Sequence, residues 1–390
     1  MSDSRPASER KVSSYCYQCV AGPDLLTVRV QDGIATEINP NFEAAKIHPA
    51  GGKVCVKAFG LVQKAYHPDR VLYPMKRTNP KKGRGEDPGF ARVSWDEALD
   101  LVASKLNAAR SAGLIDEAGY PRVAASFGGG GTPTAYMGTL PAFLAAWGPI
   151  DMSFGSGQGV KCYHSEHLYG ELWHRAFTVS ADTPLCDYLV SFGANVEASG
   201  GVCGVKRHAD ARKRGMKRVQ IEPHLSVTGA CSAEWIPIKP KTDAAFLFAM
   251  IHVLLHEHAR QHLDLAFLKH RTSSPYLIGP KGFFLRDLDS RKPLVFNQRS
   301  STAVAFDNAD VDPALEGEFD VAGVEIGADE EVTMHGTCKA RPAFAHLVAF
   351  SKDYAPEWAA PICEVKAAAI RRVANEFVAH ARGGESIEIE

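Results

Sequence analysis

Two cysteines separated by two residues form the first group in the chain with clear chemical potential. Cys16 and Cys19 make a C-x2-C pair, and Cys55 follows beyond a stretch that alternates like a β-hairpin. Iron–sulfur clusters need soft thiolate ligands, and a C-x2-C pair places two of them on one tight loop. The same pair with one distant cysteine also suits a zinc knuckle or a pair of inert thiols. The spacing therefore indicates a metal site and leaves its occupant open.

A second group of reactive side chains is concentrated in residues 155–167. It contains Cys162, His164, Ser165 and His167. A thiolate is a good donor to a transition metal, and imidazole exchanges protons near neutral pH. A small buried cysteine beside histidines that line a helix face accounts for the same residues without any chemistry. We take this segment as the candidate reactive centre, with the buried-residue interpretation as its alternative.

Local patterns predict the elements that position the first group. Residues 26–39 alternate between apolar and polar on both sides of Asp32 and Gly33, which indicates a hairpin with a type I′ turn. Ser94 and Glu97 then form a capping box before an apolar helix face that extends to about residue 110. A small β-rich module is therefore expected at the N-terminus, followed by a helical start to a second domain.

Strands and helices alternate in the rest of the chain. This order is typical of an α/β fold whose parallel strands bind ligands at their carboxyl ends. Thr242 and Asp243 are expected to cap a core helix over 244–257, and a final amphipathic helix is expected over about 365–381. Residues 272–335 mix Pro, Gly, Asp and Ser and are interpreted as an irregular insertion. Buried strands are predicted at 123–127, 188–192 and 217–221.

Composition excludes several function classes. The chain has 390 residues, 45% hydrophobic and 23% charged, which is typical of a globular protein with more than one core. Its formal net charge is -1 without a long basic block, so we expect no binding to nucleic acid or to an anionic membrane surface. Residues 1–11 lack the apolar segment of a secretory signal and a twin-arginine pair, which predicts a cytoplasmic protein.

Cysteine usage agrees with that compartment. Nine cysteines in a cytoplasmic chain of this length are expected to be ligands, free thiols or buried residues rather than disulfides. That leaves the thiols of the two groups above as the reactive ones. The others are assigned to buried positions: Cys186, Cys203, Cys231, Cys338 and Cys363.

The order of the motifs is more specific than any one of them. The C-x2-C pair is followed by Val-Cys-Val-Lys at 54–57, by a Tyr-His-Pro-Asp-Arg run at 66–70 and by Ser-Trp-Asp-Glu at 94–97. This series resembles the N-terminus of molybdopterin oxidoreductases of the dimethyl-sulfoxide reductase family. The resemblance implies an enzyme with a 4Fe-4S cluster beside a molybdenum centre held by two molybdopterin guanine dinucleotides. It also implies a small β-rich Fe-S-type domain followed by Rossmann-like parallel-sheet α/β domains.

The cluster ligands depart from the family pattern at one position. In the family a third cysteine follows the pair, whereas this chain has Pro23 there, with Asp24 beside it. Three interpretations stay open: a cluster completed by the Asp24 carboxylate, a cluster with one labile iron, and no cluster. The resemblance further places Lys57 between cluster and pterin, where a cation could stabilise the reduced cluster. The resemblance thus implies Cys16, Cys19, Asp24 and Cys55 as the cluster ligands.

Within the reactive segment, the family places its metal-ligating residue at about the position of Cys162. The resemblance therefore implies Cys162 as the protein ligand to molybdenum, with Ser165 as the second choice. His164 and His167 are the candidates for moving substrate protons, which makes them catalytic residues together with Cys162 and Lys57.

Three short elements resemble the family's dinucleotide-binding loops. They are a Gly-x-Asn loop, an acidic-Pro element and a Thr-Asp element, and each follows or precedes a predicted strand or helix. The second and third carry substitutions, with glutamate for aspartate, histidine for arginine and lysine for glycine. The implied cofactor-binding residues are Gly193, Asn195, Glu197, Glu222, His224, Lys241, Thr242 and Asp243.

The resemblance also sets domain limits and partners. We expect a disordered tail over 1–11, an Fe-S-type domain over 12–75 and an α/β region over 76–390 that is incomplete at its C-terminus. Family catalytic subunits are about twice as long or more, so this chain is a fragment, half of a split enzyme or a non-catalytic remnant. Expected partners are a small-molecule substrate, a second chain with the missing domains, an Fe-S electron-transfer subunit, and a membrane anchor subunit.

We therefore predict a molybdenum-dependent oxidoreductase catalytic subunit, or its N-terminal part. Its reaction would be a two-electron oxidation or reduction, or an oxygen-atom transfer, with electrons passed through the cluster. The alternative is a non-catalytic electron-transfer or assembly module that binds a cluster without molybdenum. A degenerate fragment that binds zinc or no metal is the third interpretation.

Overall fold

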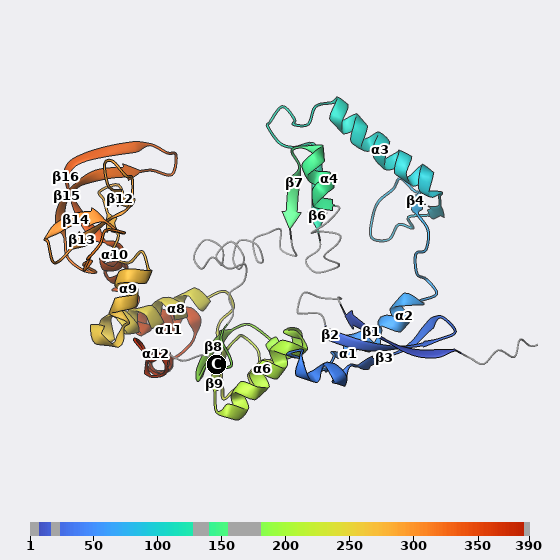
Figure 1. Ribbon diagram of the computed structural model, residues 1–390, viewed down its shortest axis with the longest axis horizontal. Helices are drawn as coiled ribbons and strands as arrows, with labels where there is room; N and C mark the ends of the chain where they lie inside the picture. Colours follow the sequence, from blue (N-terminus) through green and yellow to red (C-terminus); the bar gives the residue numbers. More distant parts are fainter. Residues whose placement is uncertain (1–7, 17–23, 128–139, 155–180, 386–390) are drawn as a thin grey trace, which may run out of the picture. The chain divides into compact units, whose positions relative to one another are not determined.

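The chain forms two compact units (Figure 1). The computed structural model describes residues 8–16, 24–127, 140–154 and 181–385. The first unit contains Met1–Pro184 and Val196–Asp210, and the second contains Leu185–Asn195 and Ala211–Glu390. Each unit has both helices and strands, so the chain has the mixed α/β character that the sequence predicts.

An antiparallel sheet opens the first unit, with strands in the order β1–β2–β3 (Figure 1). The hairpin predicted at 26–39 is confirmed as β2 (Asp24–Gln31) and β3 (Ile34–Pro40). Asp32 and Gly33 have φ values of 50° and 84°, as both central residues of a type I′ turn require. The strand β1 (Glu9–Cys16) pairs with β2, so residues 9–11, which we expected in the terminal tail, belong to the sheet.

One face of this sheet is apolar because its side chains alternate. Cys16, Leu26 and Ile38 share that face and pack on Ala58 in a buried cluster. Ala58 belongs to the helix α1 (Val56–Phe59), which is followed by α2 (Leu61–Ala65). The C-x2-C motif therefore begins at the buried end of a strand.

The helix α3 (Trp95–Ser111) confirms the predicted capping box, since the Glu97 N–H donates to Ser94 Oγ at 3.1 Å. Its apolar side chains remain exposed, including Trp95 and Leu99. The other elements of this unit are η1 (Phe42–Lys46), β4 (Met75–Arg77), β5 (Phe90–Arg92), β6 (Ala124–Phe127), α4 (Leu140–Trp147), β7 (Asp151–Phe154), α5 (Val196–Ser199) and the first part of α6 (Gly201–Arg214).

A parallel sheet in the order β10–β9–β8 forms the centre of the second unit. The strands β8 (Tyr188–Phe192) and β9 (Lys217–Ile221) have the predicted bounds and run parallel, and β10 (Glu234–Ile236) pairs with β9. Val219 and Ile221 lie in one core with helical residues such as Phe246. Apolar runs thus became buried strands, as the sequence pattern predicts.

Helices cover this core. The predicted helix 244–257 is present as α8 (Asp243–His252) continued by the π-helix η5 (Val253–Glu257). Within the described residues, none of the helices has the length and apolar character needed to cross a membrane. The remaining helices are α7 (Val227–Ala230), η6 (Arg260–His262), α9 (Leu265–Arg271), α10 (Ala343–Ser351), α11 (Pro356–Cys363) and α12 (Ala367–Ala381).

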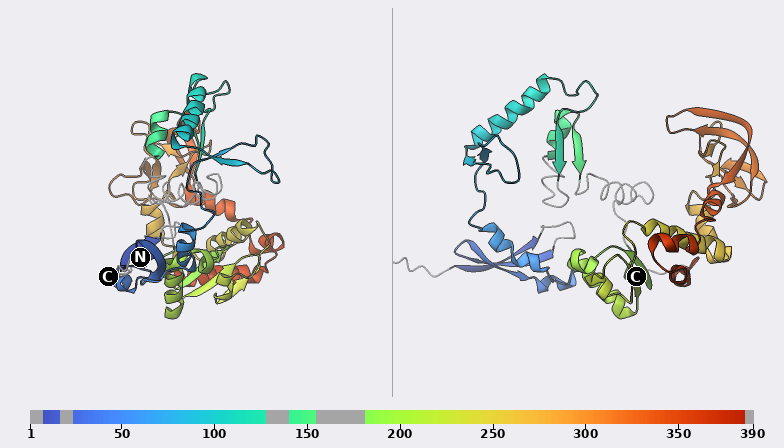
Figure 2. Two further views of the ribbon diagram at one scale, coloured as in Figure 1. Left: turned by 90° about the vertical axis from the view of Figure 1, so that its right-hand side faces the viewer. Right: turned by 180° about the vertical axis from the view of Figure 1, so that it is seen from behind.

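The expectation of an irregular insertion over 272–335 is wrong. This region forms a four-stranded antiparallel sheet in the order β11–β16–β15–β12, next to the two-stranded sheet β13–β14 (orange in Figures 1 and 2). Leu277, Leu285 and Val321 are buried in a core of their own. The strands are β11 (Leu277–Ile278), β12 (Leu285–Arg286), β13 (Leu294–Asn297), β14 (Thr302–Ala305), β15 (Phe319–Ile326) and β16 (Val332–Pro342).

A buried carboxylate holds one loop of this sheet. Glu325 on β15 is 1% exposed and accepts backbone N–H bonds from Lys281 at 3.1 Å and Phe283 at 3.0 Å. Its other oxygen lies 2.7 Å from His335 Nε2 on β16. A buried carboxylate is tolerated when donors surround it in this way. Glu325 therefore ties the loop between β11 and β12 to the two long strands.

The β-rich region offers a direct test of its core. Leu285 is 0% exposed, so Leu285→Ala should lower the free energy of unfolding by about 2–5 kcal/mol. Leu288 is 41% exposed, and Leu288→Ala is the matched control, expected to change it by less than about 0.5 kcal/mol. Urea unfolding followed by circular dichroism measures both. Equal effects would contradict the described packing.

Candidate functional site

The N-terminal cysteines are placed by strand pairing. Cys16 ends β1, and the β1–β2 register puts it directly opposite Asp24, the first residue of β2. Cys16 is 7% exposed, because it lies on the apolar face of the sheet. Cys55 is the N-cap residue of α1 and has an extended backbone. The sheet and the short helix thus present one cysteine each.

Asp24 connects these two cysteine positions. Its side chain is 7% exposed, and its Oδ2 accepts a hydrogen bond from the Cys55 N–H at 3.4 Å. Burial raises the pKa of Asp24, and the hydrogen bond from Cys55 and the positive charge of His48 oppose that rise only in part. An anionic Asp24 would therefore be stabilised by a cation at this place.

The structure brings together part of the predicted cluster site. Cys16, Asp24 and Cys55 lie around one another, whereas Cys19 and Pro23 fall outside the described residues. Lys57 is exposed in α1, two residues after Cys55. Among the described residues, no group of three or more His, Cys, Asp or Glu side chains is arranged to hold a single metal ion. A multi-iron cluster needs thiolates that surround several metal atoms, which is a wider arrangement.

The predicted buried cysteines differ in their exposure. Cys363 is buried, and Cys186, Cys203 and Cys338 are half-buried. Cys231 is exposed, so its assignment to the core is wrong: it follows the short helix α7 at the surface.

The strand ends of the second unit form a hydrogen-bonded pair of loops. After β8, Gly193 has a φ of 62° and its N–H donates to the Ile221 carbonyl at 2.9 Å. The Asn195 side-chain oxygen accepts bonds from the Thr228 N–H at 3.2 Å and from the Thr228 hydroxyl at 3.0 Å. Asn195 thus fastens the loop after β8 to the helix that follows β9.

Glu222 is the buried centre of the second loop. It is 3% exposed, and its carboxylate accepts bonds from the Ser226 N–H at 2.8 Å and from Gln220 Nε2 at 3.0 Å. Burial alone would raise the pKa of Glu222, but the bonds from Ser226 and Gln220 outweigh it and the net pKa is lowered. Each carboxylate oxygen therefore already has a protein donor, so Glu222 shapes the loop from within.

The remaining predicted cofactor residues have separate surroundings. His224 and Lys241 are exposed. Thr242 occupies the N-cap position of α8, but the predicted side-chain cap is absent, since its hydroxyl donates to the Lys239 carbonyl at 2.7 Å. Asp243 begins the helix. Glu197 lies in α5 in the first unit, with its Oε1 3.9 Å from His208 Nδ1.

The predicted reactive centre lies outside the described residues. Cys162, His164, Ser165 and His167 all belong to the segment 155–180. Their roles stay predictions.

Sequence reasoning missed the partners that fix the strand-end loops. Ser226 and Thr228 donate to Glu222 and Asn195, although neither lies in a recognised motif. Gln220 gives a usable signal, because an amide inside an otherwise apolar strand needs a specific hydrogen-bonding role.

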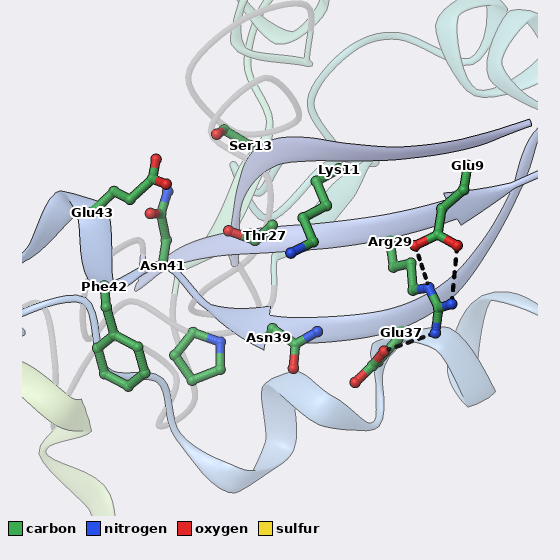
Figure 3. A pocket seen from close by; sticks show the side chains of 11 residues that line it. Glu9, Lys11, Ser13, Thr27, Arg29, Glu37, Asn39, Asn41, Phe42 and Glu43 are labelled. Carbon is green, nitrogen blue, oxygen red and sulfur yellow. Dashed lines mark hydrogen bonds and ion pairs between the residues drawn. The ribbon is translucent and has the colours of Figure 1, made fainter.

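A cavity of about 640 Å³ lies over the polar face of the N-terminal sheet. Figure 3 shows Arg29 between two carboxylates, with its Nε 2.9 Å from Glu9 and its Nη1 3.7 Å from Glu37. Both ion pairs are exposed and contribute little to stability. The cavity is lined by Glu9, Lys11, Ser13, Thr27, Arg29, Glu37, Asn39, Pro40, Asn41, Phe42 and Glu43. It lies on the face opposite the cysteines.

Comparison with known proteins identifies the family. The model of the molybdopterin oxidoreductase family matches residues 70–305, more than half of the chain. The chain belongs to the molybdopterin oxidoreductase family. The resemblance to the dimethyl-sulfoxide reductase group is thereby confirmed, together with similarity to its catalytic subunits.

Relatives of this molybdopterin oxidoreductase chain are much longer. Dimethyl sulfoxide reductase DmsA of Haemophilus influenzae is 29% identical over 64% of this chain and 31% of its own length. The sulfite dehydrogenase of Allochromatium vinosum is 25% identical over 94% of this chain and 36% of its own length. The chain spans between a quarter and two fifths of the curated relatives it matches.

A solved structure shares the fold. Acetylene hydratase from Pelobacter acetylenicus matches with a TM-score of 0.54 and 18% identity, over 95% of this chain and 37% of that one. At this identity the likeness concerns the fold alone.

The Glu222 loop makes a pH-dependent contribution to stability. Because its folded pKa lies below the ordinary 4.5, the contribution is present above pH 4.5 and is lost as pH falls through the folded value. Glu222→Gln should cost about 1–3 kcal/mol at pH 7, and the difference from wild type should shrink toward pH 3 in urea unfolding. Glu316→Gln, at an exposed ion pair with Arg260, is the control and should show little effect. A pH-independent difference would contradict the hydrogen-bonding account.

Lys241 stands where the family loop has glycine, and its φ of 67° is left-handed. A side chain at this φ costs roughly 1–2 kcal/mol that glycine avoids, offset in part by the greater freedom of glycine when unfolded. Lys241→Gly should therefore raise the free energy of unfolding by up to about 1 kcal/mol. Lys241→Ala keeps the Cβ and should give no such gain. If both variants stabilise equally, the lysine side chain rather than the backbone is responsible.

Proposed function

We propose that this chain is the N-terminal part of a molybdenum-dependent oxidoreductase catalytic subunit. The observation that carries the proposal is the family match over 70–305, next to a module in which Cys16, Asp24 and Cys55 are held together. The reaction is a two-electron oxidation or reduction, or an oxygen-atom transfer, at a molybdenum centre held by two molybdopterin guanine dinucleotides. A 4Fe-4S cluster in the N-terminal module carries the electrons.

The residues around Asp24 fit an iron–sulfur cluster in their chemistry. Thiolates of Cys16, Cys19 and Cys55 would hold it, since thiolates are the ligands that such clusters prefer. The buried Asp24, whose pKa is raised by burial, gains from nearby positive charge. Lys57 follows Cys55 closely enough to lie on the electron path toward the pterin. The module would be the Fe-S-type domain over 12–75, extended by the earlier start of β1.

The carboxyl ends of β8 and β9 suit a dinucleotide. Parallel sheets bind phosphates and sugars at this edge, through backbone N–H groups of the loops. Gly193 gives the backbone a left-handed turn after β8, and Asn195 and Glu222 fix the two loops by internal hydrogen bonds. His224, exposed after Glu222, is available for a phosphate or a base. The Lys241–Asp243 element and Glu197 complete the proposed cofactor contacts.

The reactive centre is proposed from the resemblance. Cys162 would be the protein ligand to the metal, with Ser165 as its alternative, and His164 and His167 would move protons to and from substrate. The bound molybdenum would supply the two-electron chemistry. Partners would be a small-molecule substrate, a second chain with the remaining domains, an Fe-S electron-transfer subunit, and a membrane anchor subunit. The proposed compartment is the cytoplasm.

One observation favours a second candidate. The chain spans only 31% of dimethyl sulfoxide reductase DmsA and 36% of the Allochromatium vinosum sulfite dehydrogenase. Much of what grips a second dinucleotide in a full-length catalytic chain would have to come from elsewhere. An electron-transfer or assembly module that binds a cluster without molybdenum is therefore the alternative, and a fragment with zinc or no metal is the third.

Metal content separates these functions. We expect Mo and Fe together when the protein is purified anaerobically from its native host and measured by elemental mass spectrometry, with the masses of co-purifying chains. Fe without Mo would support the electron-transfer module instead. Zn alone, or no metal, would overturn both and leave the degenerate fragment.

The ligand assignment has its own readout in the same preparation. Cys162→Ala should remove about one sulfur neighbour of molybdenum in X-ray absorption spectra, because the pterins still hold the metal. Cys231→Ala changes an exposed cysteine in the second unit and is the matched control. An unchanged sulfur number in Cys162→Ala, with Ser165→Ala altering the spectrum, would transfer the role to Ser165.

A further inference from the structure

We infer that Cys203 is the fourth thiolate ligand of the iron–sulfur cluster, in place of the cysteine that the N-terminal loop lacks at Pro23. The inference rests on the proposed function, because it names a residue of the same cluster site. It resolves the three open interpretations in favour of a complete cluster whose last ligand comes from a distant helix.

The helix α6 packs on the cysteine module. Residues Val196–Asp210 belong to the same compact unit as the N-terminal sheet, although far from it in sequence. A Cβ placed on Gly51 would lie 3.6 Å from Lys206 Cε, an ordinary van der Waals contact. Cys203 precedes Lys206 by three residues and therefore lies on the same face of the helix. That face covers the loop that leads from Gly51 to Cys55.

Asp24 links Cys203 to the other cysteines. The pKa of the Cys203 thiol is raised first by burial and then by the negative charge of Asp24, and such influence needs a separation of several ångströms. Asp24 also faces Cys16 across the β1–β2 ladder and accepts the Cys55 N–H. Three cysteines from three separate segments thus surround one buried carboxylate.

Thiolate chemistry favours Cys203 over Asp24 as the ligand. Iron in these clusters prefers soft sulfur donors, whereas a carboxylate is a hard donor. Asp24 Oδ2 is already used by the Cys55 N–H, and this bond helps to position Cys55. Cys203 lies in the first turn of the 14-residue helix α6, where backbone N–H groups stabilise a thiolate.

Ligation is a proton exchange and needs no added oxidant or reductant. As the iron–sulfur bond forms, the Cys203 thiol releases its proton to solvent, and the positive iron replaces it. A thiol whose pKa is raised by burial and by Asp24 is protonated in the apo protein. Metal binding reverses that condition because it brings the compensating charge.

Variants of the complete 390-residue chain test the inference by anaerobic reconstitution with ferrous iron and sulfide. Cys203→Ala should bind less iron than wild type, by about one atom in four, and should give a three-iron electron paramagnetic resonance signal after mild oxidation. Cys338→Ala is the matched control, since Cys338 is also half-buried with a pKa raised by burial, but lies on β16 of the second unit. It should retain the wild-type iron content and spectrum, as should Asp24→Asn.

Rescue distinguishes ligation from a structural effect. A small external thiol should restore the four-iron spectrum of Cys203→Ala, because the missing sulfur can be supplied from solvent, whereas a misfolded variant would not respond. A wild-type spectrum in Cys203→Ala, or iron loss in Asp24→Asn instead, would falsify the inference while the wild-type cluster upholds the proposed function. Failure of the wild-type chain itself to bind iron would count against the proposed cluster and, with it, against Cys203.

Discussion

The parallel pairing of β8 with β9 is the constraint on which the strand-end site depends. It places Gly193 beside Ile221, so that their backbone hydrogen bond starts both loops from the same edge. Asn195 then reaches Thr228, and Glu222 turns back to Ser226. Each of these bonds satisfies a buried polar group that would otherwise cost about 1–3 kcal/mol. The loops are therefore rigid because their polar side chains bind the protein itself.

The same device recurs in each part of the fold, with different electrostatic outcomes. Glu222 and Glu325 are buried carboxylates that accept loop N–H groups at 2.8–3.1 Å. Asp24 accepts its loop N–H from Cys55 at the longer distance of 3.4 Å. Accordingly the pKa of Glu222 is lowered, whereas burial dominates at Asp24 and raises it. The buried carboxylate least compensated by its donors is the one that lies among cysteines, where a bound cluster would bring positive charge.

Local signals were sufficient wherever a short segment determines its own structure. Asp32 and Gly33 indicate their turn, and the apolar runs at 188–192 and 217–221 indicate buried strands. The β-rich region at 277–342 gave no such signal. Several of its left-handed turn positions hold Arg291, Ser301 and Glu330 rather than glycine, and its strand β11 pairs with β16 far along the chain. Pairing between distant segments is set by packing, which short-range patterns do not contain.

The cluster site shows the same limit in a functional setting. A motif based on spacing detects Cys16, Cys19 and Cys55 because they fall near one another in sequence, and it records a defect at Pro23. It cannot detect Cys203, which reaches the module only because α6 packs on the loop before Cys55. A cluster held in this way would join β1, that loop and α6, so that cofactor binding would stabilise their packing as well as carry electrons. The loss of a cysteine from a compact motif therefore need not remove the cluster, provided the fold returns a thiolate to the same place.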